Sequence, residues 1–292
     1  MDRVLGRTTV LGGTRDGKYP HGNSLFVRGT EEAVLIDPSL SLVGRDDRPR
    51  PDRILNSHCH EDHVAGNHLY PEVPVHLHAA DRPGLDSLDA MMAIYGMSPT
   101  IDAAFRKVVV EDFHWVARPD AQAFDDGNVF ELGGCRVRVI HAPGHTRGHS
   151  LFHVEPDDVL YLGDIDLSSF GPYYGDAWSS LADFERTLAA VRRIEARWYA
   201  TFHHVGVLEG RAAFLERLDR FTAVIATREA RLLDFLAEPR TLDEIVAHRF
   251  VYRPGDAVAF ADDVERRSMR QHIDRLIAAG GVAECESGFV RA

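Results

Sequence analysis

The chain has 292 residues, 45% of them hydrophobic, and its 45 acidic and 33 basic residues give a formal net charge of −12. This length and composition allow one large core with a small appended domain, or two ordinary domains, and exclude a disordered or fibrous chain. The acidic balance repels phosphate backbones, so nucleic acid could bind only through a local basic patch, and no window is apolar enough for a membrane span.

Short strands are predicted in the first part of the chain. The segments 24–29 and 33–39 contain β-branched and aromatic residues and are separated by turn residues. A strand at Arg53–Asn56 runs directly into His58–His63 (HCHEDH), and another strand and turn follow at 73–83. A dense group of histidines and carboxylates therefore follows a strand end, where ligands commonly bind in α/β sheets.

The segment 85–113 has helical periodicity and an apolar set of methionines and an aromatic residue. The apolar set is Met91, Met92, Ile94, Tyr95 and Met97. One interpretation is a helix that faces the core. The other is a helical lid whose methionines and aromatic side chain line a substrate pocket.

Strands and loops alternate again in the second half of the chain. The segment 124–146 predicts two strands around a Gly-Gly turn and ends in a second histidine-rich loop. The segment 149–167 predicts strand, turn and strand, and ends in an acidic loop. An amphipathic helix is predicted at 180–196, and a strand at 197–206 carries a His-His pair. Several separate strands therefore end in ligand-type residues.

The composition shifts near Gly210, and the residues after it predict helices and a small hairpin. Thr241 with Glu244 three residues later forms a capping-box pattern that opens the second of these helices. The elements are helices at 212–236, from Thr241 and at 262–279, and a hairpin at 280–292. This order resembles a winged helix, so we predict a larger domain at 1–210 and a small helical, winged-helix-like C-terminal domain at 211–292.

The spacing within His58–His63 suits metal binding. His58 and His60, two residues apart on an extended segment, point to one side, whereas Cys59 points away. An aspartate and a histidine follow where the chain turns, so this segment can reach two adjacent cations. The candidate ligands are His58, His60, Asp62, His63, His145, Asp164 and either His204 or His203. Imidazoles with a carboxylate favour Zn²⁺, although Fe²⁺ and Mn²⁺ accept the same set.

These residues, in this order, resemble the metallo-β-lactamase superfamily, with its His-x-His-x-Asp-His loop, later Pro-Gly-His, Gly-Asp and final histidine. The resemblance covers roughly residues 8–210. It implies an α/β fold, a four-layer αββα sandwich, with two metal sites at one edge of the sheets. The domain at 1–210 would then be the catalytic domain.

The resemblance also implies a role for each ligand. His58, His60 and His145 would hold the first metal, Asp62, His63 and a last histidine the second, and Asp164 would bridge both. We assign the last histidine to His204, because the family usually has Gly-His there and His203 then occupies the glycine position; His203 stays the alternative. The expected cofactor is Zn, two ions per chain, with Fe or Mn as alternatives.

The expected activity is that of a metal-dependent hydrolase. Two cations that share a water lower its pKa and polarise the oxygen under attack, so the nucleophile would be a bridging hydroxide. Asp62 and Asp164 are the candidate catalytic residues that orient it. The expected substrate is a small ester, thioester or lactone. The alternatives are an endoribonuclease or phosphodiesterase of the lactamase-like type, and a mononuclear-iron dioxygenase of the persulfide type.

Three other residues near the motifs have weaker assignments. His149 is expected to hydrogen-bond a ligand, because metal-binding imidazoles need partners that fix them. Asp37 either supports the metal loop or is an ordinary turn carboxylate. Glu61 occupies the variable position of the first motif and is expected to be solvated.

The expected partner is a small-molecule substrate. Binding to nucleic acid is disfavoured because the C-terminal segment lacks a clear excess of positive charge. The N-terminus shows no secretory pattern, and the cysteines Cys59, Cys135 and Cys285 suit free thiols. We therefore expect a cytoplasmic protein without membrane contact, and the sequence leaves a homodimer open.

Overall fold

The computed structural model describes residues 1–292 and contains two mixed β-sheets. The first sheet has seven strands in chain order, antiparallel from β1 to β4 and parallel from β4 to β7. Its strands are β1 (Arg3–Leu5), β2 (Thr8–Leu11), β3 (Ser24–Arg28), β4 (Ala33–Ile36), β5 (Arg53–Leu55), β6 (Val75–His78) and β7 (Gln122–Phe124).

The second sheet has six strands in the order β13-β12-β11-β10-β9-β8. Only β11 and β12 run parallel, and the crossover between them contains helix α4 (Leu181–Val191). The strands are β8 (Val129–Glu131), β9 (Arg136–His141), β10 (Ser150–Glu155), β11 (Val159–Tyr161), β12 (Trp198–Ala200) and β13 (Val207–Glu209).

The strands are apolar on both sides because both faces of each sheet are covered. In β3, Leu25 and Val27 face the core cluster between the sheets, whereas Phe26 belongs to a smaller cluster on the outer face. A third cluster places α4 and the long helix α5 (Arg211–Phe235) on the outer face of the second sheet. The predicted αββα sandwich is confirmed.

Short helices complete the first layer. They are η1 (Thr14–Gly17), η2 (Leu40–Leu42), α1 (Glu61–Val64), η3 (Ala65–Leu69), η4 (Arg82–Leu85), α2 (Leu88–Tyr95) and α3 (Pro99–Glu111). Ser87 caps α2, because its side chain accepts a hydrogen bond from the Ala90 amide, and Pro99 opens α3. Met91, Met92, Ile94 and Tyr95 are buried in the core. The core-facing interpretation of this segment is confirmed for these four residues.

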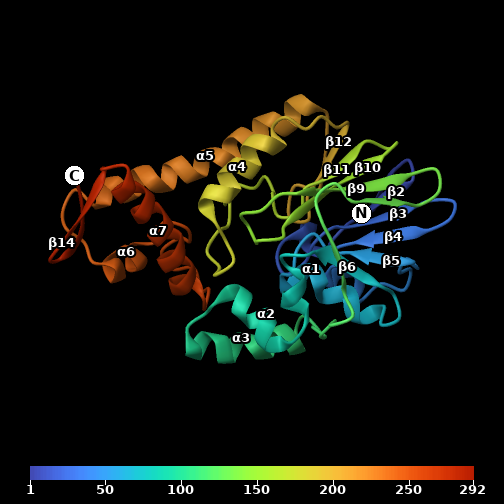
Figure 1. Ribbon diagram of the computed structural model, residues 1–292, viewed down its shortest axis with the longest axis horizontal. Helices are drawn as coiled ribbons and strands as arrows, with labels where there is room; N and C mark the ends of the chain where they lie inside the picture. Colours follow the sequence, from blue (N-terminus) through green and yellow to red (C-terminus); the bar gives the residue numbers. More distant parts are fainter.

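The C-terminal residues form α5, α6 (Leu242–His248), α7 (Ala261–Ala278) and the hairpin of β14 (Val282–Cys285) and β15 (Gly288–Arg291). Thr241 and Glu244 form the predicted capping box. Figure 1 shows α5 running from the sheets to α6 and α7. Helix α5 packs on the second sheet through Phe214, and its Leu232 belongs to the C-terminal cluster. The helices and hairpin occur in the expected order, but their identity as a winged helix and the domain boundary after residue 210 stay predictions.

None of the helices combines the length and apolar character that crossing a membrane requires.

Candidate metal centre

The candidate ligands converge on one edge of the two sheets. The segment after β5 delivers the HCHEDH motif, the β9–β10 loop delivers His145, and the ends of β11 and β12 deliver Asp164 and a histidine. Their ligand atoms form two groups, in each of which all atoms lie within 4.8 Å of one another. The groups are His58, His60, His145 and Asp164, and Asp62, His63 and His203.

Three ring nitrogens face one another in the first group. His58 Nε2 and His60 Nδ1 are 3.0 Å apart, and His145 Nε2 lies 3.2 Å from the former and 3.0 Å from the latter. Each neutral imidazole nitrogen is either a donor or an acceptor, so among three nitrogens at least one pair must be alike and cannot hydrogen-bond. A cation between them removes this conflict, because all three can then present lone pairs.

The spacing of these nitrogens also fits a metal. Tetrahedral zinc with Zn–N bonds of about 2.0–2.1 Å separates its nitrogen ligands by about 3.3–3.4 Å. Burial holds the pKa of His58 well below its usual range, which favours the neutral ring that binds metals. The donor set of the first group therefore fits a divalent cation.

The second group combines the Asp62 carboxylate with two imidazoles, and Asp164 of the first group lies beside it. Asp62 Oδ2 lies 2.9 Å from His203 Nε2, and His63 Nε2 lies 2.9 Å from Asp164 Oδ1. Burial alone would lower the pKa of His203, but the charges of Asp164 and Asp62 raise it to about 9. The buried Asp62 and the partly buried Asp164 carboxylates therefore require positive charge beside them, which protons or a metal ion can supply.

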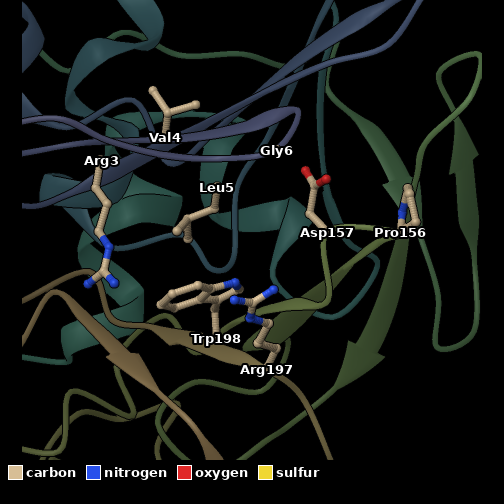
Figure 2. Close-up of a pocket in the computed structure, with 8 residues that line it drawn as sticks. All are labelled: Arg3, Val4, Leu5, Gly6, Pro156, Asp157, Arg197 and Trp198. Carbon is tan, nitrogen blue, oxygen red and sulfur yellow. The ribbon is translucent and has the colours of Figure 1, made fainter.

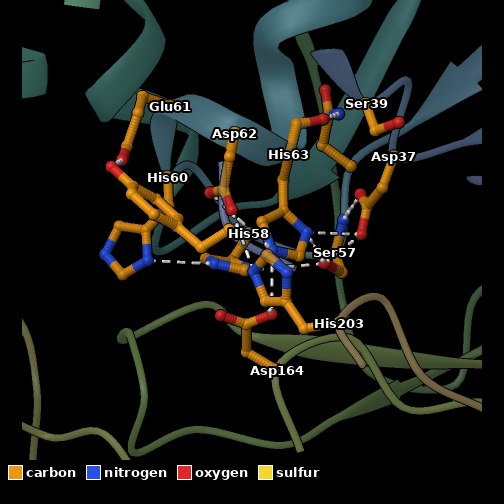
Figure 3. A network of polar contacts seen from close by, with 12 residues as sticks. Asp37, Ser39, Ser57, His58, His60, Glu61, Asp62, His63, Asp164 and His203 are labelled. Atoms are coloured by element: carbon orange, nitrogen blue, oxygen red, sulfur yellow. Dashed lines mark hydrogen bonds and ion pairs between the residues drawn. The ribbon is translucent and has the colours of Figure 1, made fainter. Parts of the chain in front are cut away.

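Asp164 lies between the two groups. Its Oδ1 faces His63, and its Oδ2 lies 3.2 Å from His145 Nε2. Although burial opposes ionisation, the charges of His63 and His203 hold the pKa of Asp164 well below its usual range. The carboxylate thus has the position that the bridging role implied by the resemblance requires (Figure 3).

The last histidine of the group is His203, where the sequence pattern favoured His204. His203 is buried, and its Nδ1 lies 3.0 Å from the carbonyl oxygens of Gly17 and His21. His204 adopts a positive φ of 53°, and its side chain is exposed. His204 lines the cavity but belongs to neither group of potential ligands. We therefore replace His204 with His203 in the candidate ligand set.

Each ligand imidazole is fixed at the nitrogen that points away from the centre. The outer contacts are His58 with Ser57 Oγ, His60 with Asp176, His63 with Asp37, His145 with the Tyr173 carbonyl and His203 with the Gly17 carbonyl. Such partners fix ring orientation and raise ligand basicity. The inner nitrogens are thereby held toward one another.

Asp37 is the most connected of these partners. Its Oδ2 accepts hydrogen bonds from Ser57 Oγ at 2.5 Å, His63 Nδ1 at 2.8 Å and the Tyr161 hydroxyl at 2.8 Å, and its Oδ1 accepts from the Ser57 amide at 2.6 Å. It is fully buried, and its backbone φ is 46°. Asp37 therefore supports the metal loop and is not an ordinary turn carboxylate (Figure 3).

Asp176 was not predicted as part of the centre. Its Oδ2 lies 3.0 Å from His60 Nε2, and its Oδ1 accepts from the Tyr173 hydroxyl at 2.9 Å. It raises the pKa of His60 to about 9, against the lowering effect of burial. It lies in an irregular loop and belongs to no motif, so the only sequence signal was the unusual density of aromatic residues around it.

Glu61 is buried, and its expected solvation is wrong. The Tyr19 hydroxyl donates to its Oε1 at 2.8 Å, and the Tyr95 hydroxyl donates to its Oε2. Tyr95 comes from α2, thirty-four residues away, and stacks on His60. The motif alone does not reveal these two hydroxyls. Their hydrogen bonds offset the cost of burying the Glu61 carboxylate.

His149 has the supporting role that was expected. Its Nδ1 lies 3.1 Å from the Ala142 carbonyl, and its Nε2 accepts from the Asp164 amide at 3.1 Å. Burial lowers the pKa of His149 to about 3, so the ring stays neutral and keeps this acceptor. It therefore fixes the backbone of Asp164.

A cavity of about 620 Å³ opens over the two groups. Its lining combines carboxylates and candidate ligand histidines with an apolar wall of Met97 and Phe105 from the α2–α3 segment and Tyr252 and Phe260 from the C-terminal segment. The α2–α3 segment thus also lines the pocket, in agreement with the lid interpretation for Tyr95 and Met97. No lysine or arginine lines the cavity.

A second cavity, of about 510 Å³, lies at the β1 edge of the first sheet (Figure 2). Arg3 and Arg197 lie 4.6 and 4.9 Å from the ring of Trp198. None of the candidate ligands lines this cavity, so it takes no part in the metal centre.

Two stacked mixed sheets with these histidine and aspartate groups at one edge define an αββα protein with two adjacent groups of potential metal ligands. The sequence matches the metallo-beta-lactamase superfamily over residues 19–227, and the chain belongs to this superfamily.

Curated relatives are distant. An uncharacterized protein of Mycobacterium tuberculosis is 29% identical over 154 residues, 48% of this chain and 65% of the relative. An atrochrysone carboxyl ACP thioesterase of Aspergillus fumigatus is 25% identical over 198 residues, 64% of this chain and 51% of the relative. An acyl-coenzyme A thioesterase of Bos taurus is 27% identical over 167 residues, 50% of this chain and 60% of the relative. The match spans less than two thirds of the length of each of these relatives.

Similar solved structures extend over nearly the whole chain. A metallo-beta-lactamase family protein from Thermus thermophilus has a TM-score of 0.71 and 23% identity, covering 98% of this chain and 99% of that chain. A beta-lactamase domain protein from Burkholderia ambifaria has a TM-score of 0.70 and 18% identity, covering 99% and 94%. At these identities the likeness shows the fold alone. Because the matches cover 98% and 99% of this chain, the similar fold includes the C-terminal helices.

Proposed function

We propose that this protein is a metal-dependent hydrolase that binds two divalent cations and acts on a small, uncharged ester, thioester or lactone. The observation that carries the proposal is the pair of adjacent histidine and aspartate groups with Asp164 between them. We propose Zn²⁺ as the metal, because imidazole and carboxylate ligands favour it.

Each side chain of the centre would hold one cation or both. His58, His60 and His145 would hold one cation, Asp62, His63 and His203 the other, and Asp164 both. Two bound cations lower the pKa of water toward neutrality and polarise the oxygen under attack.

Asp62 is the better placed of the two aspartates to accept a proton. Its Oδ2 is tied to His203 at 2.9 Å, whereas its Oδ1 is 3.9 Å from His63 Nε2 and makes no hydrogen bond. Asp164 has one oxygen toward each group and would orient the attacking water between them.

The cavity supports an acyl substrate. Its lining includes aromatic and aliphatic side chains, which suit an acyl chain, and the thioesterase names of the fungal and bovine relatives point to the same bond type.

The phosphodiesterase alternative has less support. Its substrate is an anion, and no lysine or arginine lines the cavity to hold the phosphate, so the bound cations alone would have to do so. The mononuclear dioxygenase alternative would leave the complete second ligand group without a purpose.

Elemental analysis and a substrate screen test the proposal. We expect close to two metal ions per chain and turnover of p-nitrophenyl esters, acyl thioesters or lactones by the metal-loaded protein. Absence of metal after mild purification and after reconstitution would refute the dinuclear site. Cleavage of bis-p-nitrophenyl phosphate without cleavage of any ester, thioester or lactone would establish the alternative.

A further inference from the structure

The loop at residues 162–180, between β11 and α4, contains no helix or strand but supplies several contacts of the metal centre. Asp164 lies in it, the Tyr173 carbonyl accepts from His145 Nδ1 at 3.0 Å, and Asp176 lies 3.0 Å from His60 Nε2. Long loops without regular structure are uncommon in compact domains. Such a loop has no ladder of backbone hydrogen bonds that would hold it in place. Something outside the loop must fix these groups.

Helix α5 provides one such contact through Arg228. This arginine is only 2% exposed, and it donates from Nη1 to the Pro172 carbonyl at 2.5 Å and from Nη2 to the Phe170 carbonyl at 2.8 Å. Its guanidinium also lies 5.4 Å from the rings of Phe170 and Tyr174. Arg228 makes no ion pair. A buried charge without a counter-charge is costly, and here its hydrogen bonds go to the loop backbone.

Helix α7 holds the next residues of the same loop. Gln271 Nε2 donates to the Tyr174 carbonyl at 2.9 Å, and His272 Nε2 lies 2.8 Å from the Tyr174 hydroxyl. Arg267 Nη1 donates to the Gly175 carbonyl at 3.2 Å. The loop is therefore bound to α7 directly next to Tyr173 and Asp176.

Two glycines show how closely the loop lies on these helices. A methyl group on Gly171 would meet Val224 of α5 at 2.5 Å, and one on Gly175 would meet Val264 of α7 at 2.3 Å. Gly171 also has a φ of 80°, which favours glycine. The loop has no room to move toward the helices.

We propose that α5 and α7 act as a clamp that positions the metal ligands through the 162–180 loop, with Arg228 as its main positioning residue. This inference rests on the proposed metal centre. Arg228 fixes the backbone at Phe170 and Pro172, so that the Tyr173 carbonyl and Asp176 keep His145 and His60 in ligand geometry. The C-terminal helices are then part of the metal site, although they contribute no ligand to it.

Metal affinity tests the clamp without reference to catalysis. Purified full-length protein is stripped, and Zn²⁺ affinity is measured by competition with a chromophoric chelator for the unchanged protein, Arg228→Met, Gln271→Ala and Arg220→Met. Arg220 lies on the same helix in an exposed ion pair with Glu216 and serves as the matched control. We expect Arg228→Met to weaken Zn²⁺ binding about 10- to 100-fold, Gln271→Ala to weaken it less, and the control to leave it unchanged.

The possible results are distinct. If folded Arg228→Met binds Zn²⁺ as tightly as the unchanged protein, or only lowers the unfolding midpoint, the clamp is refuted and the proposed function stands. If Arg228→Met does not fold, Gln271→Ala decides: weaker binding supports the clamp, and unchanged binding overturns it. If the unchanged protein itself binds no Zn²⁺, the metal centre and the clamp fail together.

Discussion

At the residue scale, the metal centre consists of imidazoles that are each held by their outer nitrogen. Asp37, the best example, joins His63 to Ser57 and Tyr161 within the buried edge of the first sheet. Three inner nitrogens of the first group then face one another at 3.0–3.2 Å, and three neutral rings cannot all hydrogen-bond with one another there. This arrangement fits bound cations. The contribution of single residues to metal binding can be tested by substitution.

The first prediction concerns Asp164. Asp164→Asn keeps the shape but removes one negative charge between the two ligand groups, so we expect metal content to fall below two per chain and kcat/KM to fall at least about 100-fold. Asp219→Asn, in an exposed ion pair with Arg192, is the control and should retain both. Metal analysis and ester hydrolysis measure the effect. Full metal content with full activity in Asp164→Asn would remove this carboxylate from the mechanism.

The second prediction separates the two adjacent histidines. Because His203 contacts Asp62 and His204 faces solvent, His203→Ala should lose metal and most activity, and His204→Ala should keep both. Parallel metal titrations of the two variants provide the comparison. The reverse result would restore the original assignment of His204.

The sequence allowed most ligands to be predicted, because they lie in short motifs at strand ends. It could not decide between His203 and His204, since that choice depends on one backbone turn. Asp176 and the partners of Glu61 were missed for another reason: they meet the centre through tertiary contacts from an irregular loop and from α2. No local pattern encodes such contacts.

At the element scale, α5 connects the sheets to the C-terminal helices. Its first half packs on the second sheet, where Phe214 is fully buried and stacks on Tyr199 with ring centroids 3.9 Å apart. Its last turns reach the C-terminal cluster through Leu232. Helix α5 therefore packs in two hydrophobic clusters, one on the second sheet and one in the C-terminal part of the chain.

The third prediction tests this packing. Phe214→Ala removes a buried ring and leaves a cavity, so we expect the free energy of unfolding to fall by about 3–5 kcal/mol. Val110→Ala, on the exposed face of α3, should change it by no more than about 0.5 kcal/mol. Denaturant unfolding followed by circular dichroism measures both. A loss below about 1 kcal/mol for Phe214→Ala would show that α5 packs loosely on the sheet.

Elements with strong local signals were predictable. The capping box at Thr241, the strand before the HCHEDH motif and the helix over 180–196 all occur in the structure, the last as α4. The lid and core interpretations of 85–113 could not be separated by periodicity. One helix buries Met91 in the core, and the turn after it brings Met97 to the cavity.

At the scale of the whole molecule, charge and shape act together on substrate choice. The net charge is −12, and the cavity is lined by several carboxylates and by no lysine or arginine. The long-range field therefore disfavours anions, and the cavity offers them no lysine or arginine, while its apolar wall favours acyl chains. The wall combines residues from α3 and the C-terminal segment, since Phe105 and Phe260 meet with ring centroids 5.7 Å apart.

The fourth prediction follows from this field. For two p-nitrophenyl esters of equal chain length, one neutral and one with a terminal carboxylate, we expect kcat/KM to be at least about 10-fold higher for the neutral ester at low ionic strength. Raising the salt from about 0.01 M to 0.15 M shortens the Debye length from about 30 Å to 8 Å, so the rate with the anionic ester should rise. The rate with the neutral ester should stay nearly constant, which makes it the internal control. Equal rates at low salt would mean that the bound cations dominate the potential of the cavity and that its carboxylates do not select the substrate.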